Sequence, residues 1–593
     1  MVNPDVLDIK FSEMLSKVRL LSHDSSLSTV NIAFLRNMTI EPIMPFFQYQ
    51  CFRYAVKANI YTCDYDNIMQ DVLNPQSGLY EHNPKIIFIF IKLEQIAPKF
   101  YLNCSAPTMD HTLNSINEVI SYYKFMLDAI RMNTDALVVL NSFEIPTFPF
   151  KGILDSQKNE GEVNSVRKLN SKLVSLLKEN QGALLIDFDL ICSRIGSANY
   201  YDNMQWHMSK MPFSNLAMRN IAAESSKYVI ASEGQTKKCI ILDCDNTLWG
   251  GVVGEDGENG ILIDQNHPGS YFLQFQKDLL TLKSQGVLLA ICSKNNEIDV
   301  LSALRNNDNI VLKEHDFSCM KINWELKTDN IKNIARELNI GSQHIVFVDD
   351  SEFEIEMVRK LLPEVSSILI PKNLSKLKNI FDGKGYFDKL QESEIDFQRT
   401  QMYRSENSRK KELNSSSNIE DYYSSLGIIA KVSTIDDKDV ARVAQLTQKT
   451  NQFNLTTRRY TEKEITTLQQ SDDSDIVTLK AEDKFGAYGL IGVAILKYRE
   501  GSFEIDTFLM SCRAIGRKLE EILFNECINQ GKLNFAKVCD ASFIKTEKNM
   551  QVEYFLEEHG FEVQQGDLSK KIYRCELGKI HSVVPSHIQC LYP

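Results

Sequence analysis

Residues 237–256 read KKCIILDCDNTLWGGVVGED. The apolar run Cys239–Leu242 near its start is typical of a buried strand in a parallel sheet. Two carboxylates, Asp243 and Asp245, come directly after the run, and open α/β folds bind their ligands at the carboxyl ends of such strands. A pair of hard oxygen ligands at this place suits Mg²⁺, with one carboxylate left to attack phosphorus. The stretch therefore predicts a metal-dependent phosphoryl site.

Three later segments each place polar groups at a strand or helix terminus. GVLLAICSKNN at 286–296 reads as a second buried strand that ends in Ser293 and Lys294, a hydroxyl and a cation for a phosphate. Lys327 begins the amphipathic segment KTDNIKNIARELNI, and HIVFVDDSEFE at 344–354 reads as a strand that ends in two aspartates, Asp349 and Asp350. These segments predict a phosphate and metal site at one sheet edge; the competing interpretation is that the polar residues only cap helices.

In this order the four segments resemble the motifs of the haloacid dehalogenase (HAD) phosphotransferase superfamily. The resemblance implies that Asp243 attacks the phosphoryl group and that Asp245 protonates the leaving group and then activates water. It implies a Mg²⁺ ion held by Asp243, by the main-chain carbonyl of Asp245 and by Asp349. The side chains that would bind the phosphoryl oxygens are those of Thr247, Ser293 and Lys327. Catalysis would then rest on charge neutralisation and alignment.

Length and composition limit the class of protein. A chain of 593 residues should hold three or four domains, and 43% hydrophobic residues are ordinary for globular cores. A net charge of −12 argues against nucleic acid or an anionic membrane as the main partner. The 13 cysteines show no C-x-x-C pair, which favours reduced thiols. With no secretion signal and no long apolar stretch, we expect a cytoplasmic protein.

Residues 1–236 read as a separate α/β domain. Apolar runs alternate there with helical segments, which predicts a mainly parallel sheet; the runs lie at 31–35, 85–91, 135–140 and 183–188. A turn with Thr39 follows the first run, and Asp202 and His207 come late. This layout resembles the SGNH/GDSL hydrolase fold, but the turn has no serine and the Asp–His spacing is longer than usual. We therefore predict a non-catalytic module, with a working esterase as the alternative.

Residues 237–385 should form the HAD-like core. The intervals between its first three motifs are too short to hold a large folded cap once the connecting helices are counted. We therefore expect an open mouth, which suits a bulky substrate or one that another domain covers. Trp249 lies beside the nucleophile in sequence and either packs in the core or stacks on a ligand. The charged stretch 388–413 reads as an exposed helix, so 386–418 is predicted to be a helical linker.

Residues 419–580 form a third predicted domain, and 581–593 a tail. A helix comes first, then three strands, and a second helix follows the last strand through RAIGR at 513–517. Such a turn presents backbone N–H groups and positive charge to an anion. With FLEEHGF near its end, this order resembles the GNAT acyltransferase fold, an α+β fold. In GNAT proteins the turn binds the phosphates of coenzyme A or phosphopantetheine, a role that the resemblance gives to Arg513, Gly516 and Arg517.

Two cysteines are candidate acyl carriers. Cys512 comes immediately before the RAIGR turn, where a helix N-terminus and Arg513 could lower the pKa of its thiol. The alternative is a small core residue, since free cysteine is among the most buried residue types. Cys292, before Ser293, is the rival carrier, although its place in a buried strand favours burial.

Almost the whole chain resembles FkbH-like proteins, subfamily IIIC of the HAD superfamily. The segments that carry this resemblance are LDCDNTLWGGVVGEDG, ICSKNN, NWELK, FVDDSEFE, QKTNQFNLTTRR and EIDTFLMSCRAIGR. It implies a Mg²⁺-dependent enzyme that dephosphorylates a 1,3-bisphosphoglycerate-like acyl donor. The glyceryl group would pass to the phosphopantetheine thiol of an acyl carrier protein, for a polyketide-like product. The alternatives are a plain Mg²⁺-dependent phosphatase, a scaffold without catalysis, and a coenzyme A-dependent N-acyltransferase with an accessory HAD domain.

Overall fold

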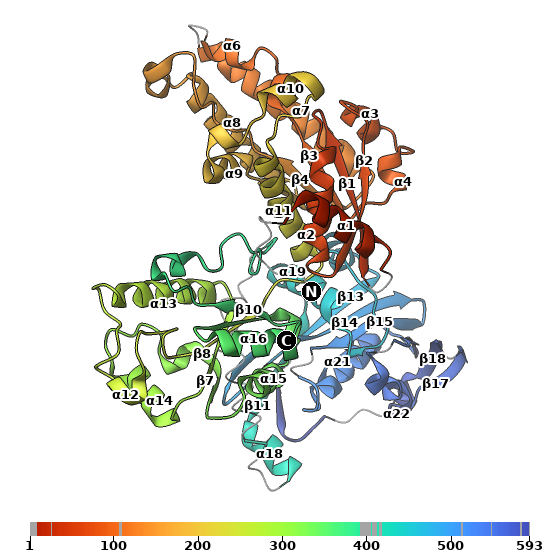
Figure 1. Cartoon of the computed structure of the whole chain (residues 1–593). Coiled ribbons are helices and arrows are strands. Elements are labelled where there is room, and N and C mark those ends of the chain that lie inside the picture. The colour runs from red at the N-terminus through yellow and green to blue at the C-terminus, as the bar shows by residue number, and fades with distance from the viewer. Residues whose placement is uncertain are drawn as a thin grey trace. The chain divides into compact units, whose positions relative to one another are not determined.

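The computed structural model describes residues 9–591 apart from 25–26, 106–108, 392–404, 406–408, 410–411, 414–417, 512–513, 547, 568 and 581–583. The chain divides into two compact units (Figure 1). The first comprises Met1–Glu314 and Met320–Asp396, and the second His315–Cys319 and Phe397–Pro593. In the described part of the chain, no helix has both the length and the apolar character needed to cross a membrane.

The N-terminal part of the first unit is built on a five-stranded parallel sheet, as predicted. Its order is β2-β1-β3-β4-β5, with β1 Ser28–Arg36, β2 Val56–Thr62, β3 Ile86–Phe90, β4 Leu137–Asn141 and β5 Ala183–Ile186. Sequence analysis missed β2 because this edge strand is only half buried and lacks a continuous apolar run.

Helices cover both faces of this sheet and form two separate cores. One core packs α1 (Phe11–Ser22), α2 (Met44–Phe52) and α11 (Asn215–Ser232) against the sheet, and the other packs α7 (Met109–Arg131) and α8 (Glu162–Glu179). The shorter helices are α3 Ile68–Leu73, α4 Gly78–Glu81, α5 Leu93–Ile96, α6 Phe100–Ser105, α9 Phe188–Ile195 and α10 Asn203–Ser209.

A second five-stranded sheet in the same unit has the order β10-β9-β6-β7-β8. Its strands are β6 Cys239–Leu242, β7 Leu288–Ser293, β8 Phe317–Ile322, β9 Ile345–Asp349 and β10 Ser366–Leu369. The connecting helices are α12 Val253–Asp256, α13 Gly269–Ser284, α14 Glu297–Asn306, α15 Lys327–Glu337 and α16 Glu352–Leu361. Because β6 lies between β7 and β9 and runs parallel to both, the groups that follow these strands meet at one edge.

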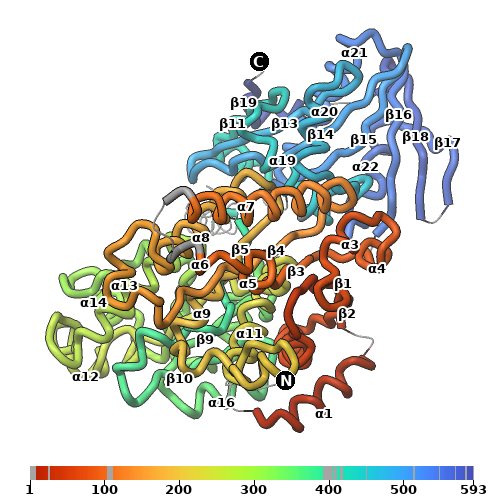
Figure 2. The backbone as a smooth tube through the Cα atoms, turned by 90° about the horizontal axis from the view of Figure 1, so that it is seen from above, coloured from red at the N-terminus to blue at the C-terminus, as the bar shows by residue number. Residues whose placement is uncertain are grey.

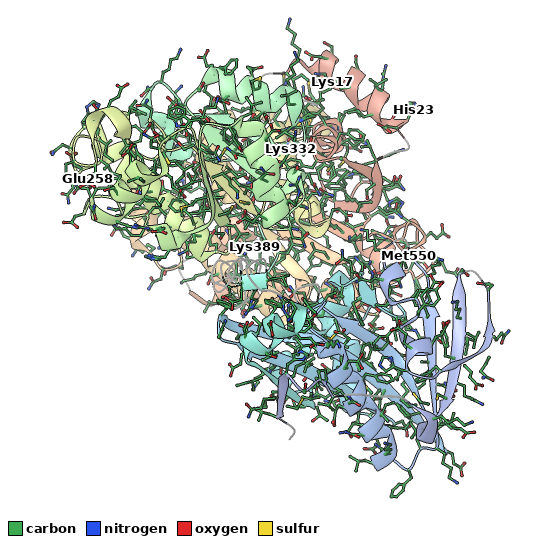
Figure 3. All side chains as sticks on the ribbon, turned by 90° about the horizontal axis from the view of Figure 1, so that it is seen from below. Lys17, His23, Glu258, Lys332, Lys389 and Met550 are labelled. Carbon is green, nitrogen blue, oxygen red and sulfur yellow. The ribbon has the colours of Figure 1, made fainter. Side chains whose placement is uncertain are left out.

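A short flap follows β6 where a cap domain could have been inserted. Gly250 and Leu262 pair across its base through two backbone hydrogen bonds of 3.1 and 2.8 Å. Glu258, labelled in Figure 3, accepts hydrogen bonds from Ser302 and Asn306 of α14. The flap is therefore pinned to the neighbouring helix.

The predicted exposed helix at 388–413 falls largely outside the described residues, but two of its described positions are buried, contrary to that expectation. Arg409 is 2% exposed and donates to Asp483 through Nε and Nη2, at 2.7 and 2.8 Å. Its guanidinium also lies 3.9 Å from the centre of the Tyr488 ring. Ser405 is buried and donates to the carbonyl of Phe485 at 2.7 Å. This part of the linker is anchored to the second unit.

The second unit is built on a single mixed sheet of nine strands. Its sheet has the order β17-β18-β16-β15-β14-β13-β11-β19, with β12 beside β15, and Figure 2 shows β13, β14, β15 and β16 side by side. The strands are β11 Ile428–Thr434, β12 Phe453–Asn454, β13 Ser474–Asp483, β14 Gly486–Arg499, β15 Ser502–Met510, β16 Val538–Ile544, β17 Glu562–Gly566, β18 Lys570–Glu576 and β19 Ile588–Leu591. The helices are α18 Ile419–Leu426, α19 Val440–Lys449, α20 Glu462–Gln469, α21 Leu519–Leu533 and α22 Phe555–Glu558.

Two central strands of this sheet separate partway along their length. β15 pairs in parallel with β16 only from Ser502 to Ile505, whereas its end, Leu509 and Met510, pairs with β12. The sheet thus opens between β15 and β16. Residues 588–591, within the segment expected to be a tail, form β19 and pair in parallel with β11.

Candidate active site

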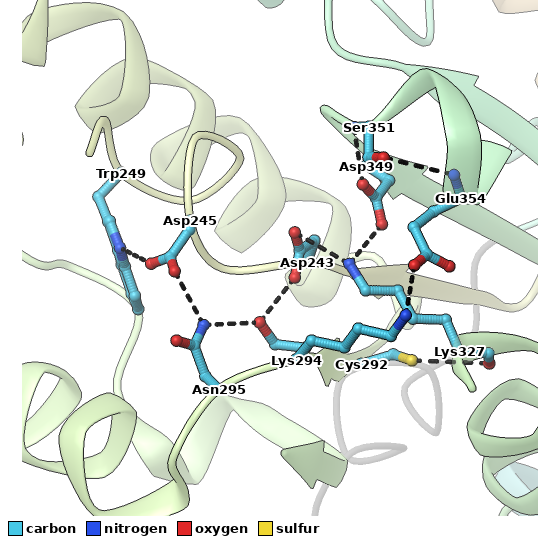
Figure 4. Close-up of polar contacts among 11 residues, drawn as sticks. Asp243, Asp245, Trp249, Cys292, Lys294, Asn295, Lys327, Asp349, Ser351 and Glu354 are labelled. Carbon is cyan, nitrogen blue, oxygen red and sulfur yellow. Dashed lines mark hydrogen bonds and ion pairs between the residues drawn. The ribbon is translucent and has the colours of Figure 1, made fainter. Parts of the chain in front are cut away.

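The carboxylate of Asp243 lies at the centre of the polar groups that follow the second sheet (Figure 4). Ser293, at the end of β7, donates its hydroxyl to Oδ1 of Asp243 at 2.6 Å. Lys327, the first residue of α15, places its Nζ atom 3.0 Å from Oδ2. Both side chains are buried, as is Asp243. Three of the predicted site residues thus meet at one carboxylate, one oxygen of which accepts a hydroxyl and the other an ammonium.

Lys327 also joins the end of β9 to the site. Its Nζ atom lies 2.6 Å from Oδ2 of Asp349, whose other oxygen accepts the backbone N–H of Ser351 at 2.8 Å. Burial alone would lower the pKa of the ammonium, but the two carboxylates raise it above its ordinary value. Burial, followed by the nearby charge of Asp243, raises the pKa of Asp349. One ammonium therefore serves two crowded carboxylates.

Asp245 is fixed by three donors. Oδ1 accepts from the indole Nε1 of Trp249 at 2.9 Å and from the backbone N–H of Val253 at 3.0 Å. Oδ2 accepts from the side-chain amide of Asn295 at 3.0 Å. The same amide lies 3.1 Å from the hydroxyl of Ser293. The predicted acid–base residue is therefore linked to the predicted nucleophile through Asn295 and Ser293.

Three carboxylates of this edge could hold a cation. One oxygen from each of Asp243, Asp349 and Asp350 lies within 4.8 Å of the other two. The partial burial of Asp350, followed by the charge of Asp243, raises the pKa of this third carboxylate too. With Lys327 as their nearby cation, the three carry a formal excess of two negative charges, and hard oxygen ligands of that charge suit a divalent ion. The chemistry of the donor set fits Mg²⁺.

Sequence reasoning missed some of these roles. Asp350 had been given no ligand role, and Asn295 and Trp249 no part in holding Asp245. The repeated acid in FVDD and the polar pair after ICSK were the available signals. Lys294, read as a cation for phosphate, instead pairs with Glu354 at 2.7 Å.

Thr247 is fully buried just after β6. Its hydroxyl has no hydrogen-bond partner within the described part of the protein. Buried polar atoms normally find a partner, so a ligand oxygen could satisfy this one. Its assignment to phosphate binding stays a prediction.

The candidate acyl carriers differ in what the structure says of them. Cys292 is fully buried in β7, and burial raises the pKa of its thiol, so it is neither accessible nor ionised. Its proposed role as rival carrier therefore has no support in this geometry. Cys512 and Arg513 lie outside the described residues, and their roles stay predictions.

The rest of the predicted anion-binding turn is described. Gly516 has a φ of 81°, a conformation that favours glycine, and its carbonyl accepts the hydroxyl of Tyr423 at 2.5 Å. Arg517 is 6% exposed, and its guanidinium lies 5.3 Å from the centre of the Tyr488 ring. Helix α21 begins at Leu519, so residues 514–518 form a turn between strand and helix. Phosphate binding by Gly516 and Arg517 stays a prediction.

The N-terminal domain does not assemble a catalytic triad from the residues singled out in its sequence. The hydroxyl of Thr39 donates to the backbone carbonyl of Ser209 at 2.5 Å. Asp202 caps α10 by accepting the N–H of Gln205, and His207 is exposed on that helix. These contacts are structural, and the non-catalytic role of this domain stays a prediction.

Comparison with known proteins supports the expected family. Residues 49–228 match the family FkbH, N-terminal domain, which confirms the predicted resemblance to FkbH-like proteins. No curated protein matches the chain.

One solved structure shares a fold with much of this chain, and a second is similar only to a small part of it. The crystal structure of the N-terminal part of BF1531 from Bacteroides fragilis, which contains a phosphatase domain and is complexed with Mg, is 24% identical with a TM-score of 0.57. It covers 63% of this chain and 98% of its own. The ribosomal-protein-S18-alanine N-acetyltransferase of Escherichia coli, at 12% identity and a TM-score of 0.21, covers 26% of this chain and 97% of its own.

Proposed function

From an FkbH-like N-terminal domain followed by a HAD-like core and a GNAT-fold unit, we propose that the chain is a Mg²⁺-dependent phosphatase and acyltransferase. It removes phosphate from a phosphorylated acyl donor of the 1,3-bisphosphoglycerate type. It transfers the glyceryl group to the phosphopantetheine thiol of an acyl carrier protein, in a polyketide-like pathway of the cytoplasm. The observation that carries the phosphatase half is the position of Asp243 between Ser293 and Lys327, beside two further carboxylates.

The phosphatase step follows from these contacts. Ser293 and Lys327 orient the carboxylate of Asp243, so that it can attack phosphorus and form an aspartyl phosphate. Asp245, held on both oxygens, gives a proton to the leaving oxygen and takes one from the attacking water. Mg²⁺ held by Asp243, Asp349 and Asp350 would neutralise charge on the phosphoryl oxygens.

The mouth of this site favours a large partner over a small free phosphate ester. Exposed apolar side chains lie at or near the N-terminal ends of three helices that begin at the same sheet edge: Ile298 at 81%, Trp324 at 70%, Leu326 at 50% and Phe353 at 66% exposure. Exposed apolar groups of this size around a polar centre are typical of interaction sites. A carrier protein with its pantetheine arm fits them.

Acyl transfer can follow from the chemistry of the same donor. An acyl phosphate is an activated donor for a thiol, and the remaining phosphate ester requires a HAD-type phosphatase. Cys512 would hold the acyl group between the two steps, with Arg513, Gly516 and Arg517 binding the phosphates of the pantetheine arm. Among the cysteines whose side chains the structure describes, each except Cys590 is buried, which leaves few of these thiols for such a role.

Intact-protein mass spectrometry of a phosphopantetheinylated carrier protein tests the proposal. The carrier is incubated with enzyme, Mg²⁺ and 1,3-bisphosphoglycerate, and a gain of one glyceryl unit is expected. Asp243→Asn should yield no glyceryl adduct, and a phosphoglyceryl adduct in this variant would place phosphate removal last. Phosphate release without any adduct would instead indicate a plain phosphatase.

Labelled donor tests the acyl carrier separately. With ¹⁴C-labelled donor, Cys512→Ala should fail to form an acyl-enzyme, whereas Cys292→Ala should form it normally. An acyl-enzyme at the wild-type level in Cys512→Ala would remove Cys512 from the mechanism. Tight binding of acetyl coenzyme A by calorimetry would favour the N-acyltransferase alternative.

A further inference from the structure

A buried carboxylate marks the point where the sheet of the second unit opens. Asp506 lies in β15 immediately after the last residue that pairs with β16. The pairing of β15 with β14 shifts at the same place: Thr507 lies opposite Ile495 and Ile505 opposite Leu496, so Asp506 has no opposite residue. Such a bulge redirects a side chain and is common beside functional sites. Asp506 is 1% exposed.

Three cationic or phenolic groups converge on this carboxylate. Lys497 of β14 donates to Oδ1 at 2.6 Å, and the guanidinium of Arg458 pairs with the same oxygen. The hydroxyl of Tyr460 donates to Oδ2, which also accepts from Thr507 at 3.0 Å. Every oxygen of the carboxylate is therefore already used by the protein.

The charges in this cluster do not balance. Asp506 faces two cations, whose side chains, Arg458 and Lys497, remain 36% and 38% exposed. Glu504, which lies opposite Lys497 in the strand pair, also acts on Arg458. Burial and then Asp506 raise the pKa of Tyr460 to about 12, so it stays a neutral donor. The nearby carboxylate of Glu504 pairs with Arg499 at 2.9 Å. Arg458, Lys497 and Arg499 thus outnumber Asp506 and Glu504 by one positive charge, and the side chains of Arg458 and Lys497 are partly exposed.

The turn that carries Arg458 is held rigidly. Asn454, fully buried, accepts the N–H groups of Thr456 and Thr457 at 3.2 and 2.8 Å and donates to the carbonyl of Thr450 at 3.0 Å. Thr457, the residue before Arg458, has a φ of 50°, which is strained for a β-branched side chain. The surrounding hydrogen bonds offset this strain, and the result is a fixed direction for the arginine.

We infer that Arg458 and Lys497, aligned by Asp506, form an anion site that binds the phosphate group of the acyl donor. Two adjacent cations, one of them a forked guanidinium, should bind a phosphate dianion more tightly than they bind a ligand with a single carboxylate. The naming of the donor rests on the proposed function; the anion site itself does not.

The same site would assist the transfer step. An attacking thiolate sulfur forms a bond to the carbonyl carbon of the acyl phosphate, and the bond from that carbon to the phosphate oxygen breaks. Phosphate leaves with the electron pair, and its added negative charge develops beside Arg458 and Lys497. These cations would therefore bind the leaving group more strongly as the bond breaks.

Arg458→Met tests the site against a matched control, Arg459→Met, which removes the same charge from the exposed next residue. The full chain is titrated with inorganic phosphate by calorimetry in EDTA, because unneutralised carboxylates should weaken phosphate binding at Asp243. We expect Arg458→Met and Lys497→Met to bind phosphate at least about tenfold more weakly than wild type. Arg459→Met should bind normally, and Arg458→Lys should recover part of the loss.

Two results would overturn the inference. One is phosphate binding by Arg458→Met at the wild-type level, with an unchanged melting temperature showing that the variant is folded. The other is equally tight binding of glycerate, which carries a carboxylate and no phosphate. If phosphate binding depends on Arg458 but wild type loads no carrier protein, the anion site stands and the proposed function fails. If carrier loading is normal in Arg458→Met, the proposal that this site assists acyl transfer is wrong.

Discussion

The indole N–H of Trp249 donates a hydrogen bond to Asp245, with 2.9 Å between Nε1 and Oδ1. Trp249 is fully buried, so it packs in the core and does not stack on a ligand. Its polar atom nevertheless reaches the candidate acid–base residue four positions earlier. Trp249 therefore belongs to the core and also contacts the candidate site.

We predict that Trp249→Phe lowers kcat for phosphate release about tenfold or more, because a hydrogen bond to a charged group contributes about 1.5–3 kcal/mol. KM should change little, since the indole does not contact substrate. Steady-state kinetics across pH would also show a shifted acidic limb, which a purely structural role would not produce. Trp206→Phe, in the N-terminal domain, is the control and should leave the phosphatase kinetics unchanged.

Asp350→Asn should raise the Mg²⁺ concentration needed for half-maximal phosphatase activity, by about tenfold. The substitution removes one of three carboxylates but leaves Lys327 with both of its partners. Calorimetric titration of the protein with Mg²⁺ gives a readout that does not need turnover. Glu352→Gln, which alters a surface pair with Lys372, is the matched control. Equal Mg²⁺ affinity in wild type and Asp350→Asn would exclude Asp350 as a ligand.

Arg409→Leu should lower the free energy of unfolding of the second unit by about 3–5 kcal/mol, because it leaves the buried carboxylate of Asp483 without its cation. Denaturant unfolding followed by circular dichroism measures the change. Lys484→Met breaks the exposed pair with Glu412 and a cation–π contact with Phe485, and it should cost about 1 kcal/mol. A loss for Arg409→Leu no larger than this control would mean that the linker is not anchored there.

The second unit should lose stability as the pH rises above neutrality. His559 packs against the rings of Phe524 and Phe555 and contacts Glu521 at 2.9 Å. Burial lowers the pKa of this imidazole, but Glu521 raises it overall above its ordinary 6.5. The stabilisation from a raised pKa is fully present at pH values below the pKa of the group in the unfolded state. It is lost as the pH rises through the pKa of the group in the folded state.

Thermal unfolding at pH values below and well above 6.5 checks this linkage. Wild type should melt at a higher temperature on the acidic side, and His559→Gln should reduce that difference. Glu521→Gln should reduce it as well, because the partner carboxylate is the source of the raised pKa. A pH dependence that is identical in all three proteins would assign the effect to other groups.

Carrier loading should depend on the apolar mouth of the phosphatase site. Trp324→Ala should lower the rate of glyceryl transfer at limiting carrier protein severalfold, since a large exposed aromatic side chain is a frequent anchor in protein contacts. Hydrolysis of p-nitrophenyl phosphate should be unchanged, because this small substrate does not need the mouth. Phe148→Ala, an exposed aromatic of the N-terminal domain, is the control. Equal losses in both assays would indicate damage to the site itself.

The order of elements could be predicted where an apolar run is followed by a polar group. The strands that end in Asp243, Ser293 and Asp349 have this pattern, and the structure brings their termini together because all three belong to one sheet. Strands without the pattern were missed. One is the half-exposed edge strand β2, and another is the late strand β19, whose partner β11 is distant in sequence. Their formation depends on the partner strand more than on local preference.

The sequence by itself determined the chemistry that the chain carries: two carboxylates after a buried strand, a hydroxyl, a lysine and a further pair of acids, in a fixed order. Tertiary structure alone decided which distant groups contact one another. Lys327 bridges Asp243 and Asp349, Asn295 joins Asp245 to Ser293, and Asp506 gathers Arg458 and Lys497 at a bulge. The reason is physical: spacing along the chain fixes the face of a strand or helix, but which distant charges meet depends on how whole elements pack.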